Sequence, residues 1–198
     1  MSRTKLIIVN GSPRCGKDTF VNMFYVECRE KYGRESCKIL TYSTVDTVKD
    51  IAERFFDYKG EKNPYWRQKL SNMKVFFDKE FNLSNNEIKE HLNVLNHNKF
   101  KDQFKALTVM IREPQQIKEV VEMVEKEYND STDVYTIFID SNRADKTQEN
   151  DADKNVENYT YDIYVANNYS LEHLREKVNG FVEILTSGGL DAYIHSRR

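Results

Sequence analysis

The chain has 198 residues, of which 39% are hydrophobic and 31% are charged, and it includes 11 Phe and 12 Tyr. This length fits a single domain and the aromatic residues can fill a core, so wholesale disorder is not expected. Its 30 basic and 32 acidic residues give a formal net charge of -2. That balance argues against binding to nucleic acid through bulk positive charge, although a phosphate site needs only a few cations.

Membrane, redox and metal signals are weak. The longest aliphatic run, residues 6–9, is far shorter than the roughly 20 residues that a bilayer-spanning helix needs. The three cysteines (Cys15, Cys28 and Cys37) form no CxxC pair, and the four histidines are scattered. This pattern predicts neither a disulfide framework nor a zinc site. We therefore expect a cytoplasmic protein with no membrane partner.

Short apolar runs predict buried strands at residues 5–9, 38–42, 108–111, 134–139 and 162–165. These runs are nearly continuous rather than alternating, which is typical of a parallel sheet covered on both faces. Helical spacing fills the intervals, at residues 17–32, 46–56, 65–81, 84–95, 114–128 and 170–185. The alternation predicts an α/β domain spanning residues 1–198, with about five parallel strands flanked by helices.

Two segments interrupt this alternation. Residues 43–105 contain helical patterns but no convincing strand, which predicts a helical insertion over one end of the sheet. Residues 141–160 are strongly polar and predict a long, lid-like surface loop. Three residues mark expected helix ends: Gly33 as a C-terminal cap, Ser84 in an S-x-x-E capping box, and Pro114 in a first turn.

The sharpest motif lies between the first predicted strand and the first predicted helix. It is a G-x-x-x-x-G-K pattern followed by two polar residues, and it consists of Gly11, Ser12, Pro13, Arg14, Cys15, Gly16, Lys17, Asp18 and Thr19. The glycines allow the backbone to wrap so that successive amides point at phosphate oxygens. Lys17 is expected to reach the β- and γ-phosphates, and the helix N-terminus adds its positive dipole end. The pattern predicts a nucleoside triphosphate site.

One position departs from the usual pattern, in which Ser or Thr follows the lysine and ligates Mg²⁺. Here Asp18 follows Lys17, and Thr19 comes next. The Asp18 carboxylate could hold the metal directly or through water, or it could simply favour the first turn of the helix. Asp18 and Thr19 are therefore the candidate metal ligands.

The form Gly-x-x-x-x-Gly-Lys-Asp-Thr resembles the P-loop of phage-type deoxynucleoside monophosphate kinases and similar small P-loop kinases. Four later segments are similar in their order along the chain: residues 43–50, 66–71, 110–114 and 162–172. The resemblance implies a P-loop kinase fold, with a helical substrate-binding insertion and a short lid. It also implies ATP and Mg²⁺ as cofactors and a (deoxy)nucleoside monophosphate as acceptor.

The resemblance also implies roles for single residues. Lys17 and Arg143 would act on the migrating phosphoryl group, with Arg143 closing alongside the lid. Arg112 would join them in catalysis by holding the acceptor phosphate together with Arg67. Arginine suits bidentate phosphate contacts, although each arginine could equally form a surface salt bridge. The turn after the second strand would complete the acceptor site with Ser43, Thr44 and Asp46.

The chain departs from the family at the end of the third strand, where Met110 occupies the place of an aspartate. Only Asp140 or Asp46 could then supply a Walker-B-type carboxylate. A nucleotide-binding module without rapid turnover, or a P-loop kinase of another small metabolite, therefore stays open as an alternative. In each case we expect a small-molecule partner and a monomer or homodimer.

Other candidates have a structural and a functional interpretation. A GTPase is not supported, because the segment from Asp57 to Gly60 follows a helix rather than a strand. Cys15 could be a redox-sensitive thiol, since a helix N-terminus lowers thiol pKa, or it could fill a variable loop position. Tyr58 and Trp66 could stack on an acceptor base or pack the helical insertion.

Overall fold

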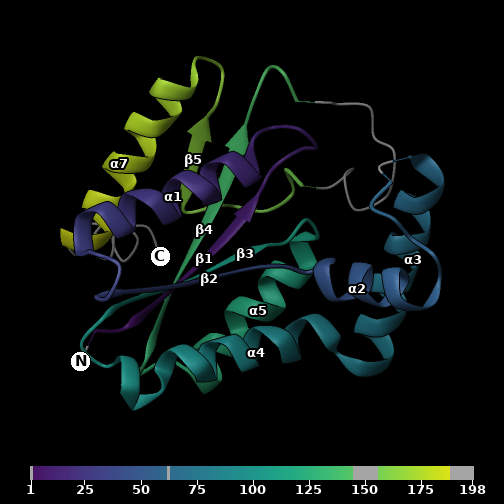
Figure 1. Cartoon of the computed structure of the whole chain (residues 1–198), viewed down its shortest axis with the longest axis horizontal. Coiled ribbons are helices and arrows are strands. Elements are labelled where there is room, and N and C mark those ends of the chain that lie inside the picture. The colour runs from purple at the N-terminus through teal and green to yellow at the C-terminus, as the bar shows by residue number, and fades with distance from the viewer. Residues whose placement is uncertain (1, 62, 145–155, 188–198) are drawn as a thin grey trace.

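The computed structural model describes residues 2–61, 63–144 and 156–187. Its centre is a parallel five-stranded sheet in the order β2-β3-β1-β4-β5 (Figure 1). The strands are β1 (Thr4–Asn10), β2 (Cys37–Ser43), β3 (Phe104–Met110), β4 (Thr132–Asp140) and β5 (Ile163–Ala166). The predicted α/β fold, with a five-stranded parallel sheet flanked by helices, is confirmed.

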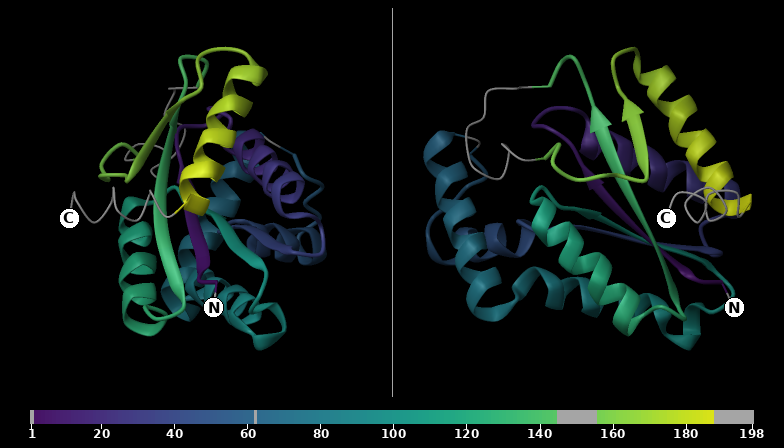
Figure 2. Two further views of the ribbon diagram at one scale, coloured as in Figure 1. Left: turned by 90° about the vertical axis from the view of Figure 1, so that its left-hand side faces the viewer. Right: turned by 180° about the vertical axis from the view of Figure 1, so that it is seen from behind.

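Helices cover both faces of the sheet, as Figures 1 and 2 show. On one face lie α1 (Lys17–Tyr32) and α7 (Leu171–Ser187), and on the other α4 (Leu83–Asn96) and α5 (Pro114–Glu127). Side chains from alternating strand positions fill the two layers. Ile7 and Val9 pack with α1 and α7, whereas Leu6 and Ile8 pack with α4 and α5. Burial on both faces explains why the strands are continuously apolar.

Two further helices, α2 (Asp46–Phe55) and α3 (Pro64–Phe81), form what we call the helical arm. The arm lies to one side of the sheet, on the right in Figure 1. It has its own small core, in which Val48, Ala52, Tyr58 and Leu70 are buried. The arm and α4 together occupy the stretch between β2 and β3, where the sequence predicts helices only.

Local signals explain two of the predicted helix ends. Gly33 ends α1 with φ 80°, and its N–H donates to the Arg29 carbonyl, while Pro114 begins α5. The predicted capping box at Ser84 is wrong. The helix α4 begins one residue earlier, and Asn82, in the left-handed conformation, precedes it. The Ser84 N–H donates instead to the Asp78 carboxylate of α3 at 2.9 Å, so a side chain from the preceding helix replaces the local cap.

Within the described ranges, no helix combines the length and the apolar character that crossing a bilayer requires. The predicted lid-like loop at residues 141–160 is described only at its two ends, and residues 145–155 lie outside the description.

Candidate functional site

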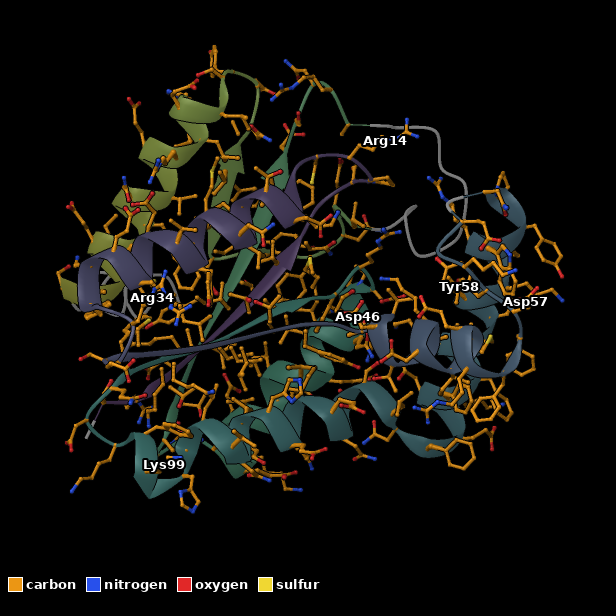
Figure 3. The ribbon with its side chains drawn as sticks, in the orientation of Figure 1. Arg14, Arg34, Asp46, Asp57, Tyr58 and Lys99 are labelled. Carbon is orange, nitrogen blue, oxygen red and sulfur yellow. The ribbon has the colours of Figure 1, made fainter. Side chains whose placement is uncertain are left out.

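The carboxyl ends of the five parallel strands meet at one edge of the sheet, here called the carboxyl edge. Ligands of open α/β sheets bind at this edge, because the loops that follow the strands converge there. Most of the residues that the sequence identifies as site candidates lie within a few residues of such a strand end or in the first turn of α1. The exceptions are Arg67 and Trp66 on α3 and Tyr58 between α2 and α3. In Figure 3, Arg14 and Asp46 lie toward the carboxyl edge, whereas Arg34 and Lys99 lie toward the opposite one.

Residues 11–16, called the phosphate loop from here on, connect the central strand β1 to α1. Gly11 has φ 143° and Gly16 has φ 100°, both in the region that favours glycine. A Cβ on Gly11 would lie 2.3 Å from the Ile139 carbonyl oxygen, and one on Gly16 would lie 2.4 Å from the Asn167 Nδ2. Conformation and space therefore both require glycine at the two positions that define the motif.

The ammonium group of Lys17 lies against the phosphate loop. Its Nζ donates to the carbonyl oxygens of Gly11 at 2.5 Å and Ser12 at 2.9 Å. The loop that precedes α1 therefore combines the amide end of a helix with a cation held at hydrogen-bonding distance from the loop backbone. Such an arrangement is suited to binding a polyanion through backbone N–H groups and one lysine.

Two buried asparagines hold the phosphate loop from either side. Asn10, the last residue of β1, accepts the Gly11 N–H at 2.7 Å and is fully buried. Asn167, after β5, donates its Nδ2 to the Cys15 carbonyl at 2.9 Å. Neither residue was predicted from the sequence as part of the site. Only the position of Asn10, directly before Gly11 at the end of an apolar strand, was a usable signal.

Cys15 is buried within the phosphate loop, 1% exposed. Burial raises the pKa of its thiol above the ordinary value, and the nearby Lys17 lowers it by less. The thiol is therefore neutral at physiological pH, so the interpretation as a reactive, low-pKa cysteine is wrong. Packing against Val9 and Phe20 accounts for the residue.

Arg143 follows β4 and is tied to the turn before α7. Its Nη2 donates to the Asn167 carbonyl at 3.1 Å, to the Asn167 Oδ1 at 3.3 Å and to the Tyr169 carbonyl at 3.1 Å. Because Asn167 also binds the Cys15 carbonyl, one side chain links Arg143 to the phosphate loop. Arg143 is thus connected to the phosphate loop, which Lys17 also contacts, through the β5–α7 turn.

Across the sheet, the turn after β2 carries the residues that the sequence assigns to an acceptor. Thr44 is buried, and its N–H and hydroxyl both donate to the Met110 carbonyl, at 3.3 and 3.4 Å. The Asp46 carboxylate accepts the Ser43 N–H at 2.9 Å and pairs with Lys49 at 2.9 Å. These bonds fix the turn against the end of β3 and leave the Asp46 oxygens already engaged.

Arg112 is exposed two residues after β3, and Arg67 is half-buried on α3 of the helical arm. Between these elements lies Lys74, which is 8% exposed. Its Nζ contacts Asp78 and Glu113, each at 3.1 Å, and donates to the Gln116 Oε1 at 2.9 Å. Lys74 therefore bonds the arm to the turn that carries Arg112, a role that the sequence did not reveal.

The described residues contain no group of three or more His, Cys, Asp or Glu side chains that could enclose a metal ion. Asp18 is exposed in the first turn of α1, Thr19 is half-buried beside it, and Asp140 is exposed at the end of β4. This sparse oxygen set fits Mg²⁺, which keeps several waters and binds largely through substrate phosphates. It does not fit a metal held by protein ligands alone.

No family model matches the chain, and no curated protein matches it in sequence. Among solved structures, the chain is similar to a thymidylate kinase from Ehrlichia chaffeensis, with a TM-score of 0.44 and 13% identity. The similarity covers 91% of this chain and 99% of that one. A likeness of this size does not decide function, so the proposal below rests on the contacts at the carboxyl edge.

Proposed function

We propose that the protein is an ATP-dependent kinase that transfers the γ-phosphate to a small acceptor, a (deoxy)nucleoside monophosphate. The observation that carries the proposal is the position of Lys17, whose Nζ lies 2.5 and 2.9 Å from the carbonyls of the phosphate loop. That loop connects the central strand β1 to the first helix, α1. Phosphoryl transfer needs positioning and positive charge more than covalent chemistry, and this site supplies both.

On the donor side, the phosphate loop would bind the ATP phosphates through its amides. Lys17 would exchange its contacts with the Gly11 and Ser12 carbonyls for phosphate oxygens. Arg143 would add a second cation from the β4 side, where its bonds to the β5–α7 turn keep it close to the loop. Loop amides together with Lys17 and Arg143 would then surround the charge that develops on the transferred group.

On the acceptor side, Arg112 and Arg67 would bind the acceptor phosphate, and Ser43, Thr44 and Asp46 would line the approach from β2. An acceptor that already carries a phosphate requires little help from a catalytic base. This fits the contacts of the Asp46 carboxylate, because one oxygen accepts the Ser43 N–H and the other pairs with Lys49. Those contacts favour a phosphate acceptor over a hydroxyl acceptor that would need Asp46 as its base.

Asp18 and Thr19 would hold Mg²⁺ beside the ATP phosphates, directly or through water. When bound, the ion neutralises phosphate charge and orients the β- and γ-oxygens. Met110, in place of an aspartate at the end of β3, leaves the metal with few protein contacts. We therefore expect its affinity to depend on the nucleotide.

The test is ADP release from ATP and Mg²⁺ across the common ribo- and deoxynucleoside monophosphates. Wild type should release ADP only with a suitable acceptor, and Lys17→Ala should lower kcat by about 100-fold or more. Lys99→Ala is the matched control, because Lys99 lies toward the opposite edge of the sheet (Figure 3). It should keep wild-type rates, and unfolding curves should show both variants folded.

Three other results would point elsewhere. ATP binding without ADP release for any acceptor would contradict the kinase and support a nucleotide-binding module. ADP release with other small metabolites but not with nucleotides would keep the kinase and replace its acceptor. Strong preference for GTP over ATP would revive a GTPase.

A further inference from the structure

Asn10 is the one polar residue among the last five of β1, and it is fully buried. Its Oδ1 accepts the Gly11 N–H at 2.7 Å. Its Nδ2 donates to the Arg112 carbonyl at 3.1 Å and to the Tyr161 hydroxyl at 2.6 Å. One amide therefore joins the phosphate loop, the end of β3 and the segment before β5. These elements are about 100 and 150 residues away in the sequence.

Only one orientation of this amide satisfies its neighbours. With the amide turned over, its NH₂ group would face the Gly11 N–H and its oxygen would face the Arg112 carbonyl. The first contact would place a donor against a donor, and the second would place an acceptor against an acceptor. A buried polar group without its hydrogen bond costs about 1–3 kcal/mol, so the observed orientation is strongly fixed.

Tyr161 holds that orientation from the other side. Its hydroxyl accepts from Asn10 and donates to the Val156 carbonyl at 2.7 Å, and its ring is 4% exposed. Phe138 and Tyr159 pack against the ring, with centroids 5.0 and 4.9 Å away. The hydroxyl thus has both a donor and an acceptor role, and packing leaves the ring little freedom to move.

We propose that Asn10 and Tyr161 are positioning residues that set the backbone at Arg112 relative to the phosphate loop. The inference rests on the proposed function, in which the loop binds the donor phosphates and Arg112 the acceptor phosphate. In-line transfer requires the two phosphates at a fixed separation, and a misplacement of about 1 Å can lower the rate 100-fold. The Asn10 amide connects the two directly, because it binds both the Gly11 N–H and the Arg112 carbonyl.

The main test compares two tyrosine hydroxyls. Tyr161→Phe removes the partner of Asn10, whereas Tyr135→Phe removes a buried hydroxyl of β4 that binds Lys5, away from the carboxyl edge. Tyr161→Phe should raise the acceptor KM and lower kcat, reducing kcat/KM for the acceptor about tenfold. The KM for ATP should stay within twofold of wild type. Tyr135→Phe should leave all three constants at wild-type values.

A second comparison separates positioning from general stabilisation. Asn10→Ala should reduce kcat/KM for the acceptor more than Tyr161→Phe does, and the double variant should be no worse than Asn10→Ala alone. Residues that act through one another give non-additive effects. Additive losses, or a Tyr161→Phe variant with wild-type kcat and acceptor KM, would overturn the inference.

Hydrogen exchange provides a readout that does not depend on turnover. In Tyr161→Phe, peptides covering residues 10–17 and 110–114 should exchange faster than in wild type, and in Tyr135→Phe they should not. If wild type transfers no phosphate, the proposed function fails, and these exchange rates still decide whether the hydroxyl holds the loop. Unchanged exchange in an active Tyr161→Phe enzyme would instead reject only the positioning role.

Discussion

The phosphate loop and the helical arm both lie beyond the carboxyl edge, but the rest of the protein holds them differently. The loop is fixed by buried groups: Asn10, Asn167 and the Gly11 backbone, which fits closely against Ile139. The arm has a separate small core and meets the β3–α5 turn through the Lys74 network. The phosphate loop is therefore built into the main core, whereas the helical arm joins it through polar bonds and the packing of Leu83 of α4 against the arm.

This difference also appears at the surface. Phe55, Phe56 and Phe76 of the arm are 67%, 57% and 55% exposed, whereas Phe20 and Phe24 of α1 are fully buried. Segments with few buried apolar contacts open at lower free energy than the core. We therefore expect the arm to loosen before the phosphate loop does. The four predictions below test this contrast, beginning with the largest effect.

The largest effect is expected for Gly11→Ala. The added Cβ would lie 2.3 Å from the Ile139 carbonyl oxygen, at a residue with φ 143°, so we expect a loss of about 3 kcal/mol or more. Nucleotide binding should be lost as well. Urea unfolding and nucleotide titration measure both effects.

Gly33→Ala is the matched control for that prediction. Gly33 also has positive φ, but no atom lies within 4 Å of its added Cβ. It should lose about 1–3 kcal/mol through backbone strain and keep nucleotide binding. Equal losses in the two variants would show that the fit of the loop against β4 is unimportant.

A smaller effect is expected for Lys74→Met. The variant leaves Asp78 and Glu113 without their cation in a half-buried setting, so we expect a loss of about 2–4 kcal/mol. The acceptor KM should rise while the KM for ATP stays constant. Lys89→Met, which breaks the more exposed Lys89–Glu127 pair, should lose about 0–1 kcal/mol. An unchanged acceptor KM in Lys74→Met would show that Lys74 does not influence acceptor binding.

Alkaline pH should weaken the main core selectively. Burial raises the pKa of Cys28 above the ordinary 9.0 and that of Cys37 to about 11, and both pack in the α1–α7 layer. Above pH 9 the unfolded thiols lose protons that the folded protein retains. The contribution of these thiols to the unfolding free energy is thus constant below pH 9 and falls between pH 9 and pH 11. The fall is at most about 1.4 kcal/mol per pH unit for each thiol.

Urea unfolding between pH 8 and pH 10 measures this slope. Cys28→Ala should reduce it, because one of the protonated thiols is gone. Since the helical arm contains no cysteine, fluorescence of its Trp66 should report little change below the global transition. An equal slope in Cys28→Ala would refute the assignment to this thiol.

The smallest effect on stability is expected for Phe76→Ser on the arm. Its ring is 55% exposed, so the unfolding free energy should change by about 0.5 kcal/mol or less. Phe24→Ser, in the main core, should by contrast lose about 3–5 kcal/mol. A large loss in Phe76→Ser would indicate that the arm surface is covered, and sedimentation of wild type would then show whether a second copy covers it.

Much of this protein could be predicted from its sequence, because the decisive signals are local. The apolar runs at residues 5–9 and 134–139 indicated buried parallel strands, and the spacing of Gly11, Gly16 and Lys17 indicated the phosphate loop. The prediction failed at Ser84, where the true partner of the N–H group is Asp78 on the preceding helix. A hydrogen bond from the Ser84 N–H to a side chain of the preceding helix is not predicted by the S-x-x-E pattern.

The tertiary structure alone decided how the site is held together. Asn10, Asn167 and Lys74 each have at least one hydrogen-bond partner that is 42 to 152 residues away in the chain. Periodicity and spacing describe a residue's neighbours along the chain, and they cannot report a hydrogen bond that forms only when distant strands align. The sequence therefore determined the sheet and the phosphate loop. The bonds that connect Arg112 and Arg143 to that loop, and the helical arm to the β3–α5 turn, depended on a few buried polar side chains between elements.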